Sequence, residues 1–241
     1  MMKAWETARL PWWNTSVARS FDGANDRLTL GSDASIDEGT IGTSKVVAFW
    51  MQRNAEASGM FLVGKDRNTV WSTLVQTASG SYLVTFIHQW SVTSGEWRGS
   101  TGIRTGEIRH VVVVYDGSLA SNDPAIYVDG VAETVAEITA PTLTFTNDDA
   151  VSFLVGETGG GFLDYNGLIQ NLTYDNTIWT DAQINLHRWW GRIGGPVLIQ
   201  HNMFTDKLTN EGTATADITV TAGTTMASLP RVQRPGCAGV W

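Results

Sequence analysis

The 241-residue sequence contains a single cysteine, Cys237, near its C-terminal end. One thiol cannot form an internal disulfide, and a metal site cannot be built from the cysteines of one such chain. No apolar run approaches the ~18 residues that a membrane-spanning helix needs, and the first residues lack the continuous apolar core of a secretory signal. We therefore expect synthesis in the cytoplasm without a signal peptide, and no membrane partner.

Charged residues are scarce, at 17% of the chain, and basic residues are outnumbered. The chain has 16 Lys and Arg against 24 Asp and Glu, which gives a formal net charge of -8. An acidic protein without a basic cluster repels phosphate backbones, so nucleic acid is not an expected partner. Hydrophobic residues make up 42% of the sequence, enough for one large core.

Stretches with helical periodicity are nearly absent. Short runs rich in β-branched and aromatic residues instead follow one another at spacings of about 8 to 12 residues, separated by Gly, Asn, Asp and Ser. The expected strands span residues 45–53, 60–65, 69–76, 81–90, 109–116, 125–130, 151–157 and 167–175. This pattern predicts an all-β fold with two packed antiparallel sheets.

Local signals predict one helix and one tight turn. Thr180 and Gln183 match a capping box at the start of a helix over residues 180–190, and Gly191 can take the left-handed conformation that ends it. The Asp129-Gly130 pair lies between two expected strands, and both residue types tolerate positive φ. We interpret this pair as a hairpin turn rather than as a chemical site.

A compositional boundary lies at the GGP of residues 194–196, beyond which apolar density falls. We therefore divide the chain into an N-terminal segment (1–18), a domain (19–195) and a C-terminal arm (196–241). The arm has one clear strand candidate, residues 216–222, and too few apolar residues to fold alone. We expect it to pack on a neighbouring subunit, with pairing to the protein's own sheet as the alternative.

No carboxylates stand at the period-two spacing that would place a glycosidase acid and nucleophile on one strand face. The closest acidic groups are Asp33, Asp37 and Glu38, together with residues 147–149, and we interpret them as solvated turn residues. The histidines, which show neither zinc-site spacing nor a readable triad, are His88, His110, His187 and His201. We therefore expect no enzymatic activity.

Eleven tryptophans are present, and an exposed indole can stack on the apolar face of a sugar ring. Trp90 and Trp97 bracket the polar loop SVTSGE, and Trp71 lies in a strand with one face that could be open. Trp71, Trp90 and Trp97 are therefore the candidate carbohydrate-binding residues, with burial in the core as the alternative.

Four motifs occur along the chain in order: SFDGANDRLTLG (20–31), RHVVVVYDGS (109–118), AIYVDGV (125–131) and FLDYNGLIQNLTYD (162–175). Together they resemble the laminin-G-like, concanavalin-A-like jelly-roll superfamily over about residues 19–190. The resemblance implies an antiparallel two-sheet jelly-roll sandwich with one short helix, followed here by a C-terminal extension.

The resemblance also implies a structural calcium ion, the one cofactor that we consider. Hard oxygen ligands of the kind calcium takes occur in segments that the fold brings together. They belong to Asp22, Asn25, Asp26, Asp164 and Asn166. The alternative is that these residues only form turns, as Asp-Gly and Asn-Gly pairs do.

A fold normally met outside cells, in a chain with no secretory signal and a tail similar to those of phage-like proteins, favours a noncatalytic virion surface protein. Such a head decoration or fibre-type module would bind other virion proteins or copies of itself through apolar residues near its ends. These assembly contacts are Trp5, Trp12, Trp13, Leu229, Val232, Val240 and Trp241. The alternative is a carbohydrate-binding or adhesion module for a cell-surface glycan, and a glycan-cleaving enzyme of the same fold is a third reading.

Overall fold

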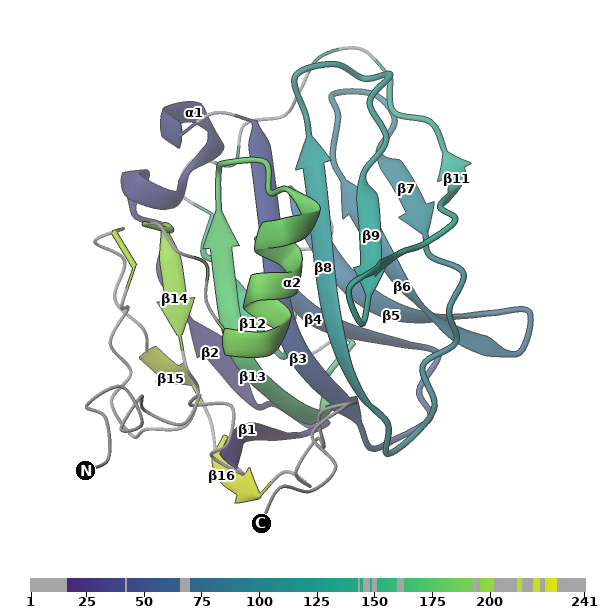
Figure 1. Cartoon of the computed structure of the whole chain (residues 1–241), viewed down its shortest axis with the longest axis vertical. Coiled ribbons are helices and arrows are strands. Elements are labelled where there is room, and N and C mark those ends of the chain that lie inside the picture. The colour runs from purple at the N-terminus through teal and green to yellow at the C-terminus, as the bar shows by residue number, and fades with distance from the viewer. Residues whose placement is uncertain are drawn as a thin grey trace, which may run out of the picture.

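The computed structural model describes residues 17–41, 43–65, 70–142, 144, 148, 151–159, 163–191, 193, 196–201, 212–213, 219–221 and 224–228. Within this part of the chain, two antiparallel sheets face each other and one helix lies against the outside of the first sheet (Figure 1). The predicted two-sheet sandwich is therefore confirmed.

The first sheet contains β1 (Val17–Asp22), β3 (Ser44–Arg53), β8 (Ile108–Asp116), β9 (Ala125–Val128), β10 (Val131–Ala132), β13 (Asn166–Asp175), β14 (Ile199–His201) and β16 (Thr225–Ser228). Their order is β10-β9-β8-β3-β13-β1-β16, and β14 also pairs with β13. The longest strands of this sheet, β3, β8 and β13, are neighbours at its centre.

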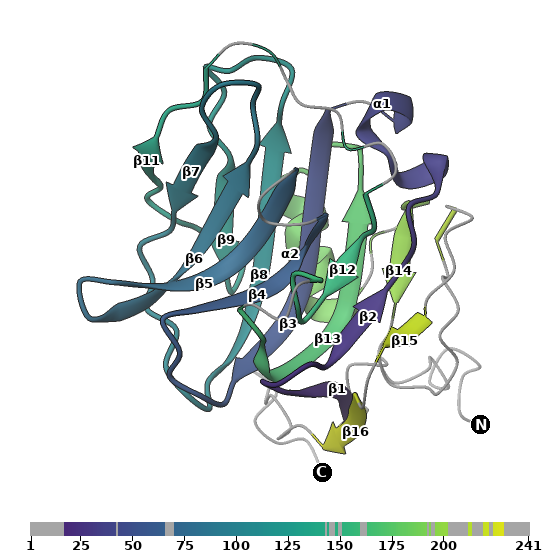
Figure 2. The same ribbon diagram turned by 180° about the vertical axis from the view of Figure 1, so that it is seen from behind.

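The second sheet contains β2 (Arg27–Thr29), β4 (Gly59–Lys65), β5 (Trp71–Ala78), β6 (Ser81–His88), β7 (Gly95–Arg98), β11 (Ala136–Thr139), β12 (Leu154–Val155) and β15 (Thr219–Thr221). Their order is β11-β7-β6-β5-β4-β12-β2-β15. Figure 2 views the molecule from behind, so that this sheet faces the reader. Two short helical elements, η2 (Ala34–Ile36) and α1 (Glu38–Ile41), connect β2 to β3.

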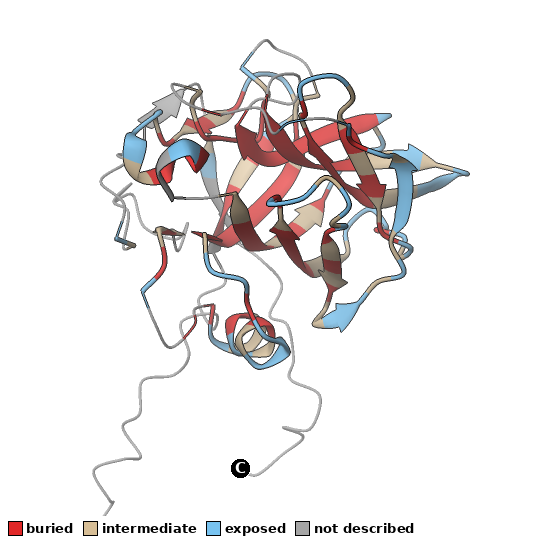
Figure 3. Ribbon diagram, turned by 90° about the horizontal axis from the view of Figure 1, so that it is seen from above, coloured by how far each residue is buried: buried red, intermediate tan, exposed pale blue. Residues whose placement is uncertain are grey.

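The main core lies between the two sheets, where the strands are mostly buried (Figure 3). Val111, Val113 and Tyr115 of β8 face this core. Val112 and Val114 point to the opposite face of the sheet, where they pack in a second cluster with helix α2 (Asp181–Trp190). The uninterrupted apolar run of β8 therefore reflects burial on both faces, which alternation alone would not indicate.

Helix α2 begins and ends where its local signals place it. The Thr180 side chain accepts from the backbone amide of Gln183, the Gln183 side chain accepts in return from the amide of Thr180, and Gly191 is left-handed at φ 66°. Two buried histidines join the helix to the sheet, with His187 Nδ1 2.9 Å from His110 Nε2. No helix in the described part is long and apolar enough to cross a membrane.

The expected hairpin turn is also confirmed. Asp129 and Gly130 both have positive φ, 53° and 78°, between β9 and β10. This is the backbone of a type I′ turn, whose twist matches that of the paired strands. The Asp129 carboxylate additionally accepts hydrogen bonds from Arg109 and from the backbone of His110.

The C-terminal arm pairs with the protein's own sheets along its described strands. β14 pairs with β13, β15 with β2, and β16 with β1. The expectation that the arm rests on a neighbouring subunit is therefore wrong for these strands. The physical reason is that β1 and β2 leave unpaired backbone groups at the sheet edges, and the arm covers them.

Candidate functional site

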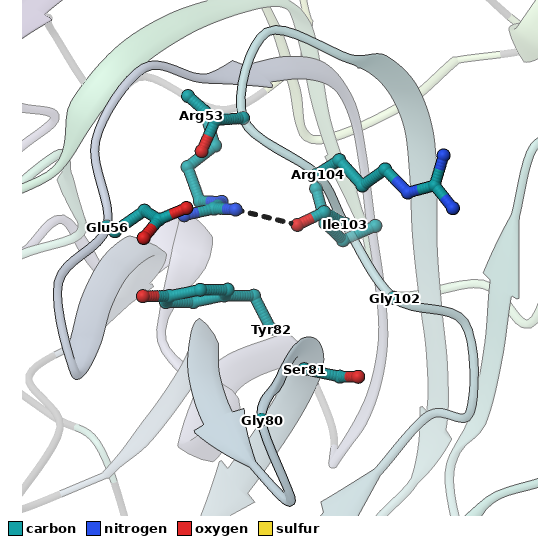
Figure 4. A pocket seen from close by; sticks show the side chains of 9 residues that line it. Arg53, Glu56, Gly80, Ser81, Tyr82, Gly102, Ile103 and Arg104 are labelled. Atoms are coloured by element: carbon teal, nitrogen blue, oxygen red, sulfur yellow. Dashed lines mark hydrogen bonds between the residues drawn. The ribbon is translucent and has the colours of Figure 1, made fainter.

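A polar pocket opens at the end of the sandwich where β3 finishes and β6 begins (Figure 4). It has a volume of about 420 Å³, within the range of about 300–1,000 Å³ that is usual for small-molecule sites. Three segments build it: the β3–β4 connection, the β5–β6 hairpin and the β7–β8 loop. The lining residues are Arg53, Glu56, Gly80, Ser81, Tyr82, Gly102, Ile103, Arg104 and Thr105.

Backbone hydrogen bonds hold the β7–β8 loop against the neighbouring strands. The Ile103 amide donates to the Tyr82 carbonyl, and the Gly106 amide donates to the Arg53 carbonyl, both at 2.7 Å. The Ile103 side chain is itself buried and anchors the loop in the core. The pocket is therefore formed before any ligand arrives, which lowers the entropic cost of binding.

Arg53 is the most buried charged side chain of the pocket, with only 2% of its surface exposed. Its Nη1 donates to the Ala55 carbonyl at 2.6 Å, and its Nη2 donates to the Ile103 carbonyl at 3.0 Å. The guanidinium carbon lies 3.7 Å from the centroid of the Tyr82 ring, a cation–π geometry visible in Figure 4. Arg53 therefore ties together all three pocket segments.

Sequence reasoning missed this pocket because its residues come from three separate connections. The available signal was the β7–β8 loop, which carries three glycines, Gly99, Gly102 and Gly106, within eight positions. A side chain at Gly102 would meet only Ser81, at 3.8 Å or more, so this glycine keeps the pocket open without being needed for close packing.

A second polar cluster lies inside the opposite end of the sandwich, beneath η2 and α1. Lys65, at the end of β4, pairs with Asp37 at 2.5 Å and with Asp148 at 2.9 Å. Asp37 is 5% exposed and Asp148 is fully buried. The interpretation as solvated turn residues is therefore wrong for Asp37 and Asp148, because the strand ends supply buried lysines that compensate their charge. Asp33, by contrast, is exposed and caps η2, as a turn residue would.

Glu38 forms the other half of this cluster. Its carboxylate pairs with Lys45 at the start of β3, and lies 3.3 Å from His88 Nε2. Burial acts to raise the pKa of Glu38, but the Lys45 ammonium and the hydrogen bond from His88 outweigh it and lower the pKa. Burial also lowers the pKa of Lys45, and it lowers the pKa of His88 to about 4 with help from the Lys45 charge.

The cluster is closed to ligands because the side chains of its ion pairs are at most 7% exposed. Removing one member would leave an uncompensated charge in the interior, which costs about 3–5 kcal/mol. We assign it a structural role, in which Asp37 and Glu38 fasten η2 and α1 over the end of the core. The open pocket is therefore the candidate functional site.

Comparison with known proteins identifies the fold family. Residues 22–185 match the family model of the concanavalin A-like lectin/glucanases superfamily. The chain belongs to this superfamily. Comparison with curated protein sequences finds no match.

Two solved structures illustrate how the superfamily fold is shared at low sequence identity. One is a protein from Bacteroides ovatus whose name gives carbohydrate binding as its inferred role; it is 16% identical, with a TM-score of 0.60 over 89% of this chain. The chain spans 60% of that protein's length. The other is a heptameric SAP-like pentraxin from Limulus polyphemus, 14% identical with a TM-score of 0.59, covering 89% of this chain and 96% of its own. These similarities establish the fold alone.

Three of the five candidate calcium ligands are already engaged in the turns of this superfamily fold. Asp22 Oδ1 accepts from the Ala24 amide, Asp26 Oδ2 accepts from the Asp22 amide, and Asn166 Nδ2 donates to the Asp22 carbonyl. Burial raises the pKa of Asp26 and of Asp164, which opposes their ionisation. In the part of the chain that the structure describes, no three acidic, histidine or cysteine side chains are placed to hold a metal. The hydrogen bonds of Asp22, Asp26 and Asn166 favour the turn-forming alternative for these three residues, and a calcium ion at the full set stays a prediction.

The candidate sugar-binding tryptophans are buried, so they offer no ring face to a sugar. Trp71 and Trp97 have no exposed surface and Trp90 has 6%. Trp71 stacks on Tyr174 with ring centroids 5.6 Å apart, and Trp97 Nε1 donates to Asp123 at 2.7 Å. The expectation that they contact a ligand is wrong for Trp71 and Trp97 because the strand faces they occupy point into the core of the sandwich. It is wrong for Trp90 because this residue, just after β6, is buried against the His88 ring.

The expected assembly contacts and Cys237 lie outside the described residues. A virion role for these residues stays a prediction.

Proposed function

We propose that the protein is a noncatalytic carbohydrate-binding module and that the pocket between the β5–β6 hairpin and the β7–β8 loop is its sugar site. The supporting observation is the combination of a preformed, open cavity with hydroxyl, guanidinium, carboxylate and aromatic groups in its lining. Such groups recognise sugars by hydrogen bonds to hydroxyls and by contact with the ring. The fold similarity to a protein named for carbohydrate binding supports the same reading.

The noncatalytic part of the proposal rests on the acids of the pocket. Among its described lining residues, Glu56 is the single carboxylate. Glycosidases of the usual kinds need two, one as acid and one as base or nucleophile. We expect no release of reducing sugar when the pure protein is incubated with a panel of polysaccharides. Reproducible cleavage of any of them would contradict the proposal.

A pocket-filling variant tests the location of the site. Gly102→Gln places a side chain in the cavity at a position where the first added atom meets no neighbour closer than 3.8 Å, so the fold should be retained. We expect binding to glycans on an array, and retardation in polysaccharide-containing gels, to be lost in Gly102→Gln. The matched control is Ser121→Gln, on the exposed β8–β9 connection. Equal binding by Gly102→Gln and the wild-type chain would place the sugar site elsewhere.

The predicted location on a virion is independent of this site. A glycan-binding module on a particle surface would serve attachment to a cell, so the two roles are compatible. A mass-spectrometric inventory of purified particles tests the location, and absence of the protein from them would refute it.

A further inference from the structure

The pocket contains a buried cation that no carboxylate neutralises. Arg53 is 2% exposed, and no Asp or Glu among the described residues lies within ion-pair distance of it. Buried charges are normally paired, because removing an ion from water is costly. Arg53 thus differs from the buried Lys45 and Lys65, each of which has a carboxylate partner.

The hydrogen bonds of Arg53 do not remove this charge. Its two terminal nitrogens donate to the carbonyls of Ala55 and Ile103, which are neutral acceptors. Its Nε is buried and has no acceptor in the described part of the chain. The Tyr82 ring stabilises the cation through its π face and carries no net charge. The guanidinium therefore keeps its full positive charge at the wall of the cavity.

The other charged groups of the lining leave the pocket positive. Arg104 stands at the rim with 86% of its side chain exposed, and Glu56 is also exposed. Among the lining residues themselves, two cations stand against one anion, on a chain whose formal net charge is -8. Glu107, just outside the lining, lies 4.0 Å from Arg104 and offsets part of its charge, so the buried Arg53 is the main positive group of the pocket. Because the whole molecule repels anions, an acidic ligand would bind here through local recognition rather than through nonspecific adsorption.

We propose that the pocket selects an acidic sugar, a pyranose unit that carries a carboxylate or a sulfate, with the anionic group facing Arg53 and Arg104. This inference rests on the proposed carbohydrate-binding function and narrows its ligand class. Guanidinium groups bind carboxylates and sulfates with charge-assisted hydrogen bonds, which are stronger than those to neutral hydroxyls. Glu56 opposes an anion in the pocket and so limits its affinity.

Matched ligand pairs test the charge requirement. The probes are oligogalacturonate and its carboxyl-reduced form, and a sulfated oligosaccharide and its desulfated form, measured by calorimetry with the wild-type chain. We expect at least one acidic probe to bind at least tenfold more tightly than its neutral counterpart, and the responding pair identifies carboxylate or sulfate as the anion. If neutral forms bind as well as acidic ones, the acidic-sugar inference fails and the carbohydrate function stands. If no acidic or neutral glycan binds, both fail.

Charge variants on exposed residues test the geometry without endangering the fold. Glu56→Gln should strengthen binding of the acidic probe by about two- to fivefold, and Arg104→Gln should weaken it by a similar factor, as single exposed charges do. Neither should change binding of a neutral probe. Two controls make the same changes in net charge outside the pocket lining and should have no effect: Glu137→Gln on an exposed residue and Arg188→Gln on a half-buried one. Equal responses to pocket and control variants would overturn the inference.

Discussion

Three buried histidines should make the folded protein sensitive to mild acid. His88, His110 and His187 are fully buried. Burial lowers the pKa of His88 to about 4, with a further contribution from Lys45, and lowers the pKa of His187 to about 3. Burial and the neighbouring His187 also hold the pKa of His110 well below its usual value. All three are therefore neutral in the folded state across the physiological range.

The sign of the effect follows from proton uptake. In the unfolded chain each imidazole titrates near 6.5, so below that pH the unfolded state binds protons that the folded state does not. The free energy of unfolding should be highest above about pH 6.5 and should fall as the pH drops toward the folded values. At pH 5, His88 and His187 each account for a loss of about 2 kcal/mol, and His110 acts in the same direction. A loss of about 4 kcal/mol is a large part of the 5–15 kcal/mol that stabilises a typical domain.

Urea unfolding followed by tryptophan fluorescence at pH 7.5 and 5.0 measures this loss. Buried carboxyls such as Asp148, whose pKa is raised by burial and by Glu38, favour the folded state as pH falls and reduce the total. His187→Gln removes one titrating group, together with the smaller His187 contribution to the low pKa of His110, which burial mainly sets. Its stability difference from the wild-type chain should change by about 2 kcal/mol between the two pH values.

A control variant separates titration from simple weakening of helix docking. Ile184→Val removes a buried methylene from the same helix, and it should cost about 1 kcal/mol at both pH values. The reasoning is refuted if the wild-type chain has the same unfolding free energy at pH 7.5 and 5.0. It is also refuted if the His187→Gln difference does not depend on pH.

Three further predictions concern stability. A chain ending at Ile193 loses β14, β15 and β16, which exposes the strands they pair with in both sheets. It should therefore melt at a clearly lower temperature in calorimetry. An unchanged melting temperature would show that the arm does not contribute to stability. Lys45→Met should lower the free energy of unfolding, measured in urea, by about 3–5 kcal/mol because it leaves the buried Glu38 carboxylate without its cation. Adding Glu38→Gln to this variant should recover part of the loss. No recovery would argue against the ion pair. Calcium should leave the melting temperature unchanged, and a rise that grows with calcium concentration would reveal a site.

Helix α2, the hairpin turn and the longer strands could be predicted because their signals are local. The strands that were not among the expected ranges are β1, β2, β7, β10, β11, β14 and β16. A capping box joins Thr180 to Gln183, three residues away, and the left-handed residues Asp129 and Gly130 are adjacent. The expected strand at 151–157 shortened to Leu154–Val155, since only these residues pair with β2 and β4. Pairing depends on neighbours that come from elsewhere in the chain.

The sequence by itself therefore determined the all-β class, the helix with its caps, the Asp-Gly turn and the superfamily resemblance, because each depends on residues that are close together or on a repeated motif order. Only the tertiary structure decided which polar residues are buried and which aromatic residues are exposed. Asp37 and Lys65 are 28 positions apart, yet form a buried ion pair, and Arg53 meets Ile103 across 50 positions. Such contacts arise from the packing of the two sheets, which brings together residues that no local pattern relates.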